Sequence, residues 1–302
     1  MNYELFRNFV PTMMPLISFI ITYHNEPEAY LQDCLDSILA LRLSPEEAEI
    51  IVVDDGSEVP PTFAGREGIQ YVRQEQAGLS VARNTGIKYA QGNYIQFVDA
   101  DDCLISSVYE AVIEQLRTEV CDLVLFRSST NPKECDKGRV VRKCSGAFFL
   151  QHHNLRAAAW GYAFRREILG DLRFCPGLLH EDELFTPQLF LRAESLVELN
   201  AKAYFYRQHS GTITNSKSPL QVQKRLDDIY LILNKLKSFD EPVLKRRIRQ
   251  LTVDYLQKTG TLTHSSREYR KRKKELRKEG LLPLPLRCYS LRYFFFALAS
   301  KV

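Results

Sequence analysis

Two apolar runs that end in acidic residues constrain the fold of this chain more than any other feature. The runs "EIIVVDDGS" (49–57) and "NYIQFVDADD" (93–102) are rich in β-branched and aromatic residues, and both end in aspartates. Short apolar runs of this kind are typical of buried strands. In a parallel sheet the carboxyl ends of the strands meet at one edge, where ligands bind. The pattern therefore predicts two acidic strand ends that face one crevice.

The segments around these runs alternate between strand and helix patterns. A buried strand is expected at 16–23, and the helix after it begins near Pro27. Four further elements continue the alternation, namely strands at 69–74 and 121–126 and helices at 78–92 and 106–119. Strands that alternate with helices indicate an α/β fold with a mostly parallel sheet flanked by helices.

The composition is that of a globular protein with an ample core. Of the 302 residues, 45% are hydrophobic and 26% are charged. No apolar stretch approaches the roughly 20 residues that span a bilayer. The N-terminus has an apolar stretch but no small-residue cleavage site, so we expect no signal peptide. The seven cysteines form no C-x-x-C pair, which favours reduced thiols in a cytoplasmic protein over a zinc site or a disulfide framework.

The net charge of +4 hides an uneven distribution of charged residues. Residues 245–302 contain 16 Lys/Arg and 4 Asp/Glu, which leaves 25 Lys/Arg and 33 Asp/Glu for the rest of the chain. An acidic body with a basic tail indicates two functional zones.

The aspartates at the end of the second run admit two interpretations. Asp99, Asp101 and Asp102 include a D-x-D pattern. In isolation such a pattern is usually a solvated turn beside a helix cap. The strand-then-acid pattern recurs at Asp54 and Asp55, and this repetition favours a hard-cation site made of carboxylates and nucleotide phosphate oxygens. A Mg²⁺ or Mn²⁺ ion there would stabilise the charge that develops on a diphosphate leaving group.

Several segments taken together resemble one known enzyme family. The order and spacing of "SFIITYHNEPEAYLQDCLDSIL", "EIIVVDDGS" and "GLSVARNTGIKYAQGNYIQFVDADD" within residues 16–102 are similar to glycosyltransferase family two, the inverting enzymes of the GT-A fold. More weakly, "LLHEDELF" (178–185) and "YRQHSGTIT" (206–214) resemble later motifs of that family.

The resemblance implies a division of the chain. A Rossmann-like GT-A catalytic domain would occupy residues 1–215. Its nucleotide-sugar half would cover about 15–102 and its acceptor half 103–215. Residues 216–302 would form a basic helical C-terminal appendage.

The resemblance also implies a nucleotide-sugar site, with UDP favoured. Asp55 would hydrogen-bond the base, and His24 would take the place of the aromatic residue that stacks on it. Arg83 would lie near the diphosphate, where a guanidinium suits phosphate oxygens. Seven residues would form the nucleotide site: Thr22, Tyr23, His24, Asp54, Asp55, Arg83 and Asp99.

The same resemblance supplies metal ligands and a catalytic base. Asp101, Asp102 and His209 would hold Mn²⁺ or Mg²⁺. Inverting transfer is a single displacement that needs a general base, and Asp182 would be that base. The acids at 181–183 could equally be the first turn of a helix, stabilised by the helix dipole. Three residues would contact the acceptor or phosphate: Glu181, Trp160 and Arg207.

The implied function is transfer of a hexosyl or N-acetylhexosaminyl group from a nucleotide sugar to a hydroxyl of a glycan or lipid-linked acceptor, in cell-envelope polysaccharide synthesis. Two alternatives stay open, an inactive nucleotide- or glycan-binding protein of the same fold and a sugar nucleotidyltransferase. The second would be expected to carry a glycine-rich phosphate loop, and "ITYHNEPE" contains no glycine. P-loop and dinucleotide motifs are absent, and no motif specifies nucleic-acid binding.

The basic tail has two interpretations. Residues 219–259 have a helical pattern, residues 267–280 are strongly basic, and Phe294 to Phe296 follow. These aromatics could pack on the body of the protein and leave the basic face solvated. Alternatively, the tail could attach to an anionic membrane surface, since basic residues and inserted aromatics both favour that location. The second interpretation would place the protein peripherally on the inner face of the plasma membrane.

Overall fold

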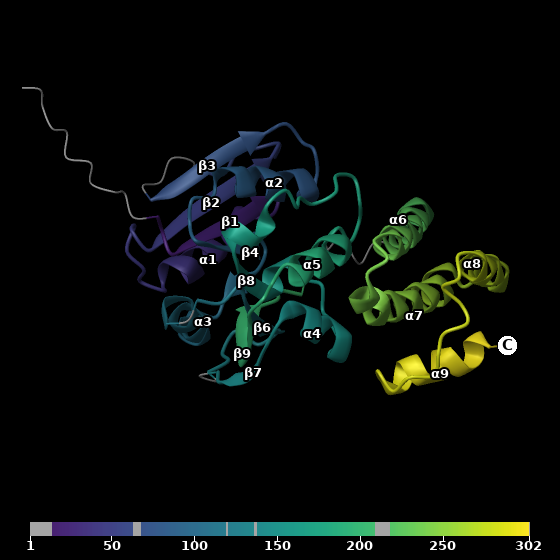
Figure 1. Ribbon diagram of the computed structural model, residues 1–302. Coiled ribbons are helices and arrows are strands. Elements are labelled where there is room, and N and C mark those ends of the chain that lie inside the picture. Colours follow the sequence, from purple (N-terminus) through teal and green to yellow (C-terminus); the bar gives the residue numbers. More distant parts are fainter. Residues whose placement is uncertain (1–13, 63–67, 119, 136–137, 209–217, 302) are drawn as a thin grey trace, which may run out of the picture.

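One mixed β-sheet forms the centre of the protein. The computed structural model describes residues 14–62, 68–118, 120–135, 138–208 and 218–301. The strands are β1 (Ile17–Tyr23), β2 (Ala48–Asp55), β3 (Ile69–Gln74), β4 (Tyr94–Asp99), β5 (Cys103–Leu104), β6 (Leu123–Ser129), β7 (Val140–Cys144), β8 (Tyr162–Arg165) and β9 (Leu196–Phe205). Within these residues the sheet order is β3–β2–β1–β4–β8–β6–β9–β5, and β7 pairs with β9 (Figure 1).

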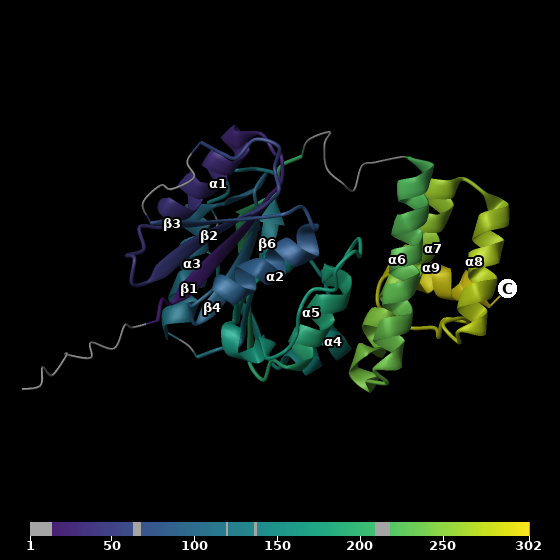
Figure 2. The ribbon, with the colours of Figure 1, turned by 90° about the horizontal axis from the view of Figure 1, so that it is seen from above.

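Helices cover both faces of the sheet, and a helical region follows it. The helices that alternate with strands are α1 (Glu28–Leu39), α2 (Leu79–Tyr89), α3 (Ser106–Thr118), α4 (Gly146–His152) and α5 (Asp182–Leu191). The C-terminal helices are α6 (Pro219–Ser238), α7 (Lys245–Thr263), α8 (Ser266–Lys278) and α9 (Leu291–Ser300). Figure 2 shows α1 and α3 on one side of the sheet and α2 and α5 on the other.

The expected α/β fold is confirmed, but the sheet is mixed rather than mostly parallel. Strands β1 to β4 pair in parallel, as the nucleotide half predicts. In the second half β8 runs antiparallel to both β4 and β6, and β5 and β7 run antiparallel to β9. Strands β5 and β8 contain two and four residues, too few to show a period in the sequence.

The side chains of β1 alternate between two hydrophobic cores. Ile17, Phe19 and Ile21 pack with α1 and α3, whereas Ile20 packs with α2 and α5. Because both faces of the strand are covered, its sequence is a continuous apolar run. The acids therefore appear only where the strands leave this cover, at their carboxyl ends.

The C-terminal helices share a core with the sheet. The apolar positions expected in α6, namely Val222, Leu226, Ile229 and Leu233, are buried. Leu276 and Tyr293, from α8 and α9, belong to the same hydrophobic core as Phe97 and Phe164 of the sheet. The tail is therefore packed on the body of the protein, as the first interpretation expected. The expected domain boundary at 215/216 lies outside the described residues.

The aromatic run in α9 does not pack entirely on the body of the protein, as had been expected of Phe294 to Phe296. Tyr293 and Ala297 bury the inner face of the helix, whereas Phe295 is 64% exposed. No helix in the described part of the chain combines the length and the apolar character needed to cross a membrane.

Candidate functional site

The predicted crevice lies where β1, β2 and β4 end side by side. Tyr23 of β1 is in register with Asp54 of β2, and Thr22 is in register with Asp99 of β4. The sequences "TYHN", "DDGS" and "DADD" are thus brought together at one edge of the sheet. This placement confirms that the two acidic strand ends meet at one edge of the sheet.

Asp54 builds the turn after β2 and does not face the crevice. Its side chain is fully buried and accepts hydrogen bonds from the Ser57 N–H at 2.8 Å and the Tyr71 hydroxyl at 2.6 Å. Burial alone would raise the pKa of Asp54, but the hydrogen bonds from Ser57 and Tyr71 outweigh it and lower the pKa. The predicted nucleotide contact by Asp54 is therefore wrong, because both carboxylate oxygens serve the turn.

Asp55 keeps a carboxylate oxygen available for a ligand. Its Oδ1 accepts from the Ala77 N–H at 2.8 Å and from the Gln74 side-chain amide at 2.7 Å. Within the part of the chain that the structure describes, its Oδ2 accepts one hydrogen bond, from the Gly78 N–H at 2.7 Å. A carboxylate oxygen can accept two hydrogen bonds, so Oδ2 can take one more donor. The position therefore suits the predicted contact with a base.

His24 is held in one tautomer next to Asp55. Its Nδ1 donates to the backbone oxygen of Asp55 at 2.8 Å, and its Nε2 accepts from the Gln76 amide at 3.0 Å. These partners place the proton of a neutral imidazole on Nδ1. Thr22 and Tyr23 are buried at the end of β1, directly before His24 in the chain.

Arg83 differs most from its expected role. Its guanidinium is 3% exposed and pairs with Asp99 at 2.9 Å and with Glu181. The rings of Phe97 and Phe174 lie within 5.8 and 5.3 Å of it. The predicted diphosphate contact is not available to a side chain held in this way. Arg83 instead links the end of β4 to the start of α5.

The acid loop (residues 99–102) carries negative charge that the surrounding residues compensate only in part. Asp102 is buried, and its Oδ1 accepts from the Arg207 N–H at 2.8 Å. Within the described residues its Oδ2 has no hydrogen-bond partner. Burial, together with Asp99 and Asp101, raises the pKa of Asp102 to about 8. Burial also raises the pKa of Asp99, although Arg83 opposes it.

These carboxylates fit a divalent cation whose coordination shell is completed by a bound ligand. A cation would compensate the crowded charge and give the unpartnered Asp102 oxygen an interaction. The described residues contain no group of three His, Cys, Asp or Glu side chains placed to hold a metal by themselves. Ligand oxygens, such as those of a diphosphate, would have to supply the remaining coordination. His209, the third predicted ligand, lies outside the described residues.

Arg207 packs across the acid loop. Its Nε donates to the backbone oxygen of Asp101 at 2.7 Å, and its guanidinium pairs with Asp33 of α1 at 2.9 Å. The same guanidinium lies 4.4 Å from the centre of the Tyr30 ring. Arg207 therefore fastens the loop to α1, a role that differs from the predicted phosphate contact.

Asp182 has the properties of a base that works near neutral pH. It is the first residue of α5, and the preceding residue, Glu181, pairs with Arg83. Burial raises the pKa of Asp182 to about 7, with Glu181 and Asp99 adding to the rise and Arg83 and Arg247 opposing it. The interpretation as the first turn of a helix is confirmed for Asp182 and Glu183, and the role of Asp182 as the base stays a prediction.

The sequence motifs did not reveal several residues of the site. Glu26 accepts from the His24 N–H at 2.5 Å, and burial raises its pKa to about 7. The Tyr204 hydroxyl accepts from the Asp99 N–H at 3.1 Å. Glu26 directly precedes Pro27 at a helix start, where an acid is ordinary, so no sequence pattern distinguished it from a helix-start residue.

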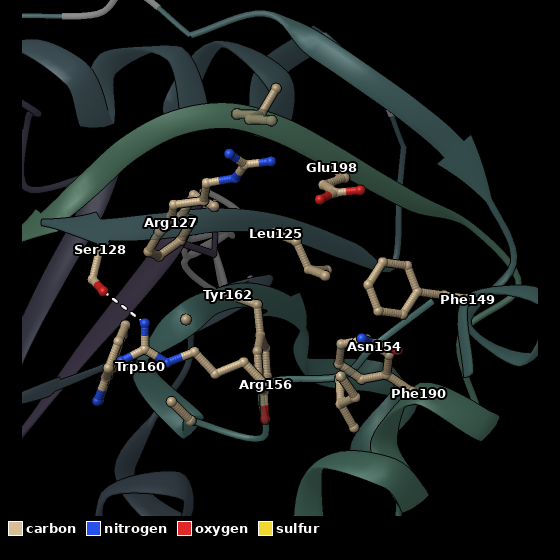
Figure 3. Close-up of a pocket in the computed structure, with 15 residues that line it drawn as sticks. Leu125, Arg127, Ser128, Phe149, Asn154, Arg156, Trp160, Tyr162, Phe190 and Glu198 are labelled. Carbon is tan, nitrogen blue, oxygen red and sulfur yellow. Dashed lines mark hydrogen bonds between the residues drawn. The ribbon is translucent and has the colours of Figure 1, made fainter. Parts of the chain in front are cut away.

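Trp160 lines a cavity of about 280 Å³ in the acceptor half (Figure 3). Leu125, Ser128, Arg156 and Tyr162 form part of the wall. One face of the indole stacks on Tyr204, with 4.3 Å between ring centroids, and the Arg156 guanidinium lies 4.6 Å from the ring centre. Both faces of the indole are covered, so the predicted contact of Trp160 with an acceptor would have to use the edge of the ring. Its edge still contributes to the cavity.

Asp182→Asn tests the raised pKa without any need for activity. The pKa of Asp182 is about 7 in the folded protein, and an aspartate in an unfolded chain has a pKa of about 4. The free energy of unfolding therefore falls as the pH rises between these values. At pH 8 the variant should be more stable than the parent by about 1–3 kcal/mol, and the difference should shrink toward pH 4. Urea denaturation at several pH values measures it.

The matched control is Asp171→Asn, an exposed aspartate that pairs with Arg192. The control should show no gain that grows with pH. A stability difference for Asp182→Asn that is constant from pH 4 to pH 8 would contradict the raised pKa.

Comparison with known proteins agrees with this geometry. The Bacillus subtilis protein EpsJ, named an uncharacterized glycosyltransferase, is 33% identical over 227 residues, 67% of this chain and 64% of its own length. Streptococcus pneumoniae glycosyltransferase GlyA is 31% identical over 221 residues, 66% of this chain and 31% of its own length. The chain thus spans less than two thirds of both relatives.

A solved structure and a family model give the remaining evidence. Residues 1–349 of Staphylococcus aureus TarS in complex with UDP superpose with a TM-score of 0.63 at 18% identity, over 94% of this chain and 87% of that chain. This similarity confirms the GT-A fold. The model of the family described as "Glycosyl transferase family 2" matches residues 18–172, just over half of the chain. The chain therefore belongs to glycosyl transferase family 2.

Proposed function

We propose that the protein is an inverting glycosyltransferase. In this proposal it moves a sugar from a UDP-sugar to a hydroxyl of a glycan or lipid-linked acceptor in cell-envelope polysaccharide synthesis. The proposal rests mainly on one observation. Arg83 pairs with Asp99 of the acid loop and with Glu181, the residue before Asp182, whose pKa is about 7. TarS, named a poly(ribitol-phosphate) beta-N-acetylglucosaminyltransferase, has also been solved in complex with UDP-GlcNAc, and this supports the choice of donor.

The donor half provides a reason to favour uracil. The remaining acceptor position on Asp55 Oδ2 suits the N–H group of a uracil ring. The His24 imidazole, fixed by Asp55 and Gln76, offers a flat face beside that position. The diphosphate would then extend past the end of β1 toward the acid loop, which follows β4.

The acid loop would hold a cation together with the diphosphate. Asp101 and Asp102, with His209 as a third ligand, would bind Mn²⁺ or Mg²⁺. The ion supplies positive charge to the departing diphosphate when it is bound. The unpartnered Oδ2 of Asp102 and its raised pKa support this assignment.

Asp182 would accept the proton of the acceptor hydroxyl. As that oxygen forms a bond to the anomeric carbon, the bond from this carbon to the diphosphate breaks and its electron pair leaves with the diphosphate. Attack from the opposite face inverts the anomeric configuration. A base with a pKa of about 7 is half ionised at neutral pH and is well matched to this transfer. Membership of the family argues against the alternative of a nucleotidyltransferase.

We also propose that α9 attaches the protein to an anionic membrane surface. Leu291, Phe295 and Leu298 are 81%, 64% and 43% exposed, and their spacing places them on one face of the helix. Arg287 precedes α9 by four residues, and Lys301 directly follows the helix. Exposed apolar residues flanked by basic ones are typical of helices that lie in a membrane interface.

Asp182→Asn should lower turnover about 10²–10⁴-fold, because the amide keeps the shape of the carboxylate but cannot accept the proton. The measurement is UDP release from a panel of UDP-sugars in the presence of Mn²⁺. Asp171→Asn is the control and should keep the parent rate. A turnover of Asp182→Asn equal to that of the parent would place the base elsewhere.

Phe295→Glu should reduce co-sedimentation with vesicles of phosphatidylglycerol and phosphatidylcholine, since it puts a negative charge at the centre of the exposed face of α9. The parent should bind at low salt and dissociate as salt is added, because screening weakens attraction to the anionic surface. Leu231→Glu, at an exposed position of α6, is the matched control. Equal sedimentation of all three proteins would show that α9 does not contact lipid.

A further inference from the structure

Residues 177–183, the segment that leads into α5, contact side chains of the C-terminal helices α6 and α7. Asp228 of α6 accepts a hydrogen bond from the Leu179 N–H at 2.8 Å. Lys224, also of α6, donates to the backbone oxygen of Gly177 at 2.8 Å. Lys258 of α7 lies 3.4 Å from His180 Nε2. Side chains of α6 and α7 thus contact the segment 177–183 at Gly177, Leu179 and His180.

A fourth contact reaches the residue next to Asp182. Arg247 of α7 is 4% exposed and pairs with Glu183 in the first turn of α5. The same guanidinium donates to the backbone oxygen of Leu155 at 3.0 Å. A charge so well removed from water stays there only with partners, so this contact fixes both the first turn of α5 and the loop beside it.

The segment needs such support because part of its backbone is in the left-handed region. His180 has a φ of +62° and Gly177 a φ of +78°. Glycine adopts this conformation readily, whereas a residue with a Cβ does so at a cost. A strained residue persists where its surroundings over-determine it. Here the surroundings are the side chains of α6 and α7.

We propose that Arg247 is a positioning residue for the catalytic base, acting through Glu183 to fix the first turn of α5. Lys258 contributes in the same way through His180. The inference rests on the proposed function, in which Asp182 is the base. It goes further by making the C-terminal helices a working part of the catalytic site rather than an appendage.

Several charged groups face Asp182, and they determine the direction in which each variant should shift its pKa. The titratable and charged side chains near it are Arg83 of α2, Asp99 of β4, Tyr162 of β8, the adjacent Glu181 and Glu183, and Arg247 and Lys258 of α7. The positive charge of Arg247 lowers the pKa of Asp182 against the rise caused by burial. Removing that charge should therefore raise the pKa, whereas removing the negative charge of Glu183 should lower it.

The test compares Arg247→Gln with Glu183→Gln in the full chain. Both variants break the same ion pair, but the acidic limb of the kcat profile should move up by about half a pH unit in the first and down in the second. Turnover should fall about 10–100-fold in Arg247→Gln through misplacement of the base, with the KM for the UDP-sugar unchanged. Arg247→Lys should restore part of the turnover.

Arg272→Gln is the matched control for folding. Arg272 of α8 is 3% exposed and pairs with Asp227 and Glu268, none of which belongs to the segment 177–183. This variant should lower the Tm but keep the parent pH profile. Amide hydrogen exchange, measured below each Tm, should be faster in residues 177–183 for Arg247→Gln and unchanged there for Arg272→Gln.

The outcomes separate this inference from the proposed function. Unchanged exchange in residues 177–183 of Arg247→Gln overturns the inference, whatever the activity. Shifts of the acidic limb in the same direction for Arg247→Gln and Glu183→Gln also overturn it. If the parent releases no UDP from any sugar in the panel, the proposed function fails, and the exchange comparison alone then decides whether Arg247 holds the segment.

Discussion

The rest of the crevice depends on the buried guanidinium of Arg83. It pairs with Asp99 at the end of β4 and with Glu181 at the start of α5, and it is only 3% exposed. Removing one member of such a buried group leaves an uncompensated charge, at a cost of about 3–5 kcal/mol. The pairing therefore connects the acid loop to the start of α5, the two places where the proposed function puts the leaving group and the base.

Local sequence features predicted the elements and the acids but not the pairings. The apolar runs ending in "VDDGS" and "VDADD" identified β2, β4 and the crevice, because strands covered on both faces leave a continuous apolar signal. Arg83 was recognised as a site residue, yet its partner Glu181 is 98 positions away, and no periodicity carries information over that distance. Asp54 was misassigned for the same reason, since Tyr71 donates to the carboxylate that a nucleotide was expected to contact. Tyr204, which covers one face of Trp160, is likewise far from it in the sequence.

The C-terminal region illustrates a second limit. The helical spacing of Val222 and Leu226 predicted α6 correctly, but it assigned no role to the basic residues of α7. Arg247 is instead buried against Glu183, and Lys258 lies beside His180. A basic residue in a helix has the same sequence signature whether water or a buried carboxylate faces it. Only the packing of α7 against the start of α5 distinguishes the two cases.

The central claim is that the crevice has two acidic centres with separate roles, one for the nucleotide with its cation and one for the proton. Titration of UDP into the parent, Asp101→Asn and Asp182→Asn proteins, in Mn²⁺ and in EDTA, tests it most directly. The account predicts that the parent and Asp182→Asn bind UDP equally well in Mn²⁺. Asp101→Asn, and every protein in EDTA, should bind at least about tenfold more weakly, the equivalent of about 1.4 kcal/mol. Equal weakening by the two substitutions, or binding that is unaffected by EDTA, would contradict it.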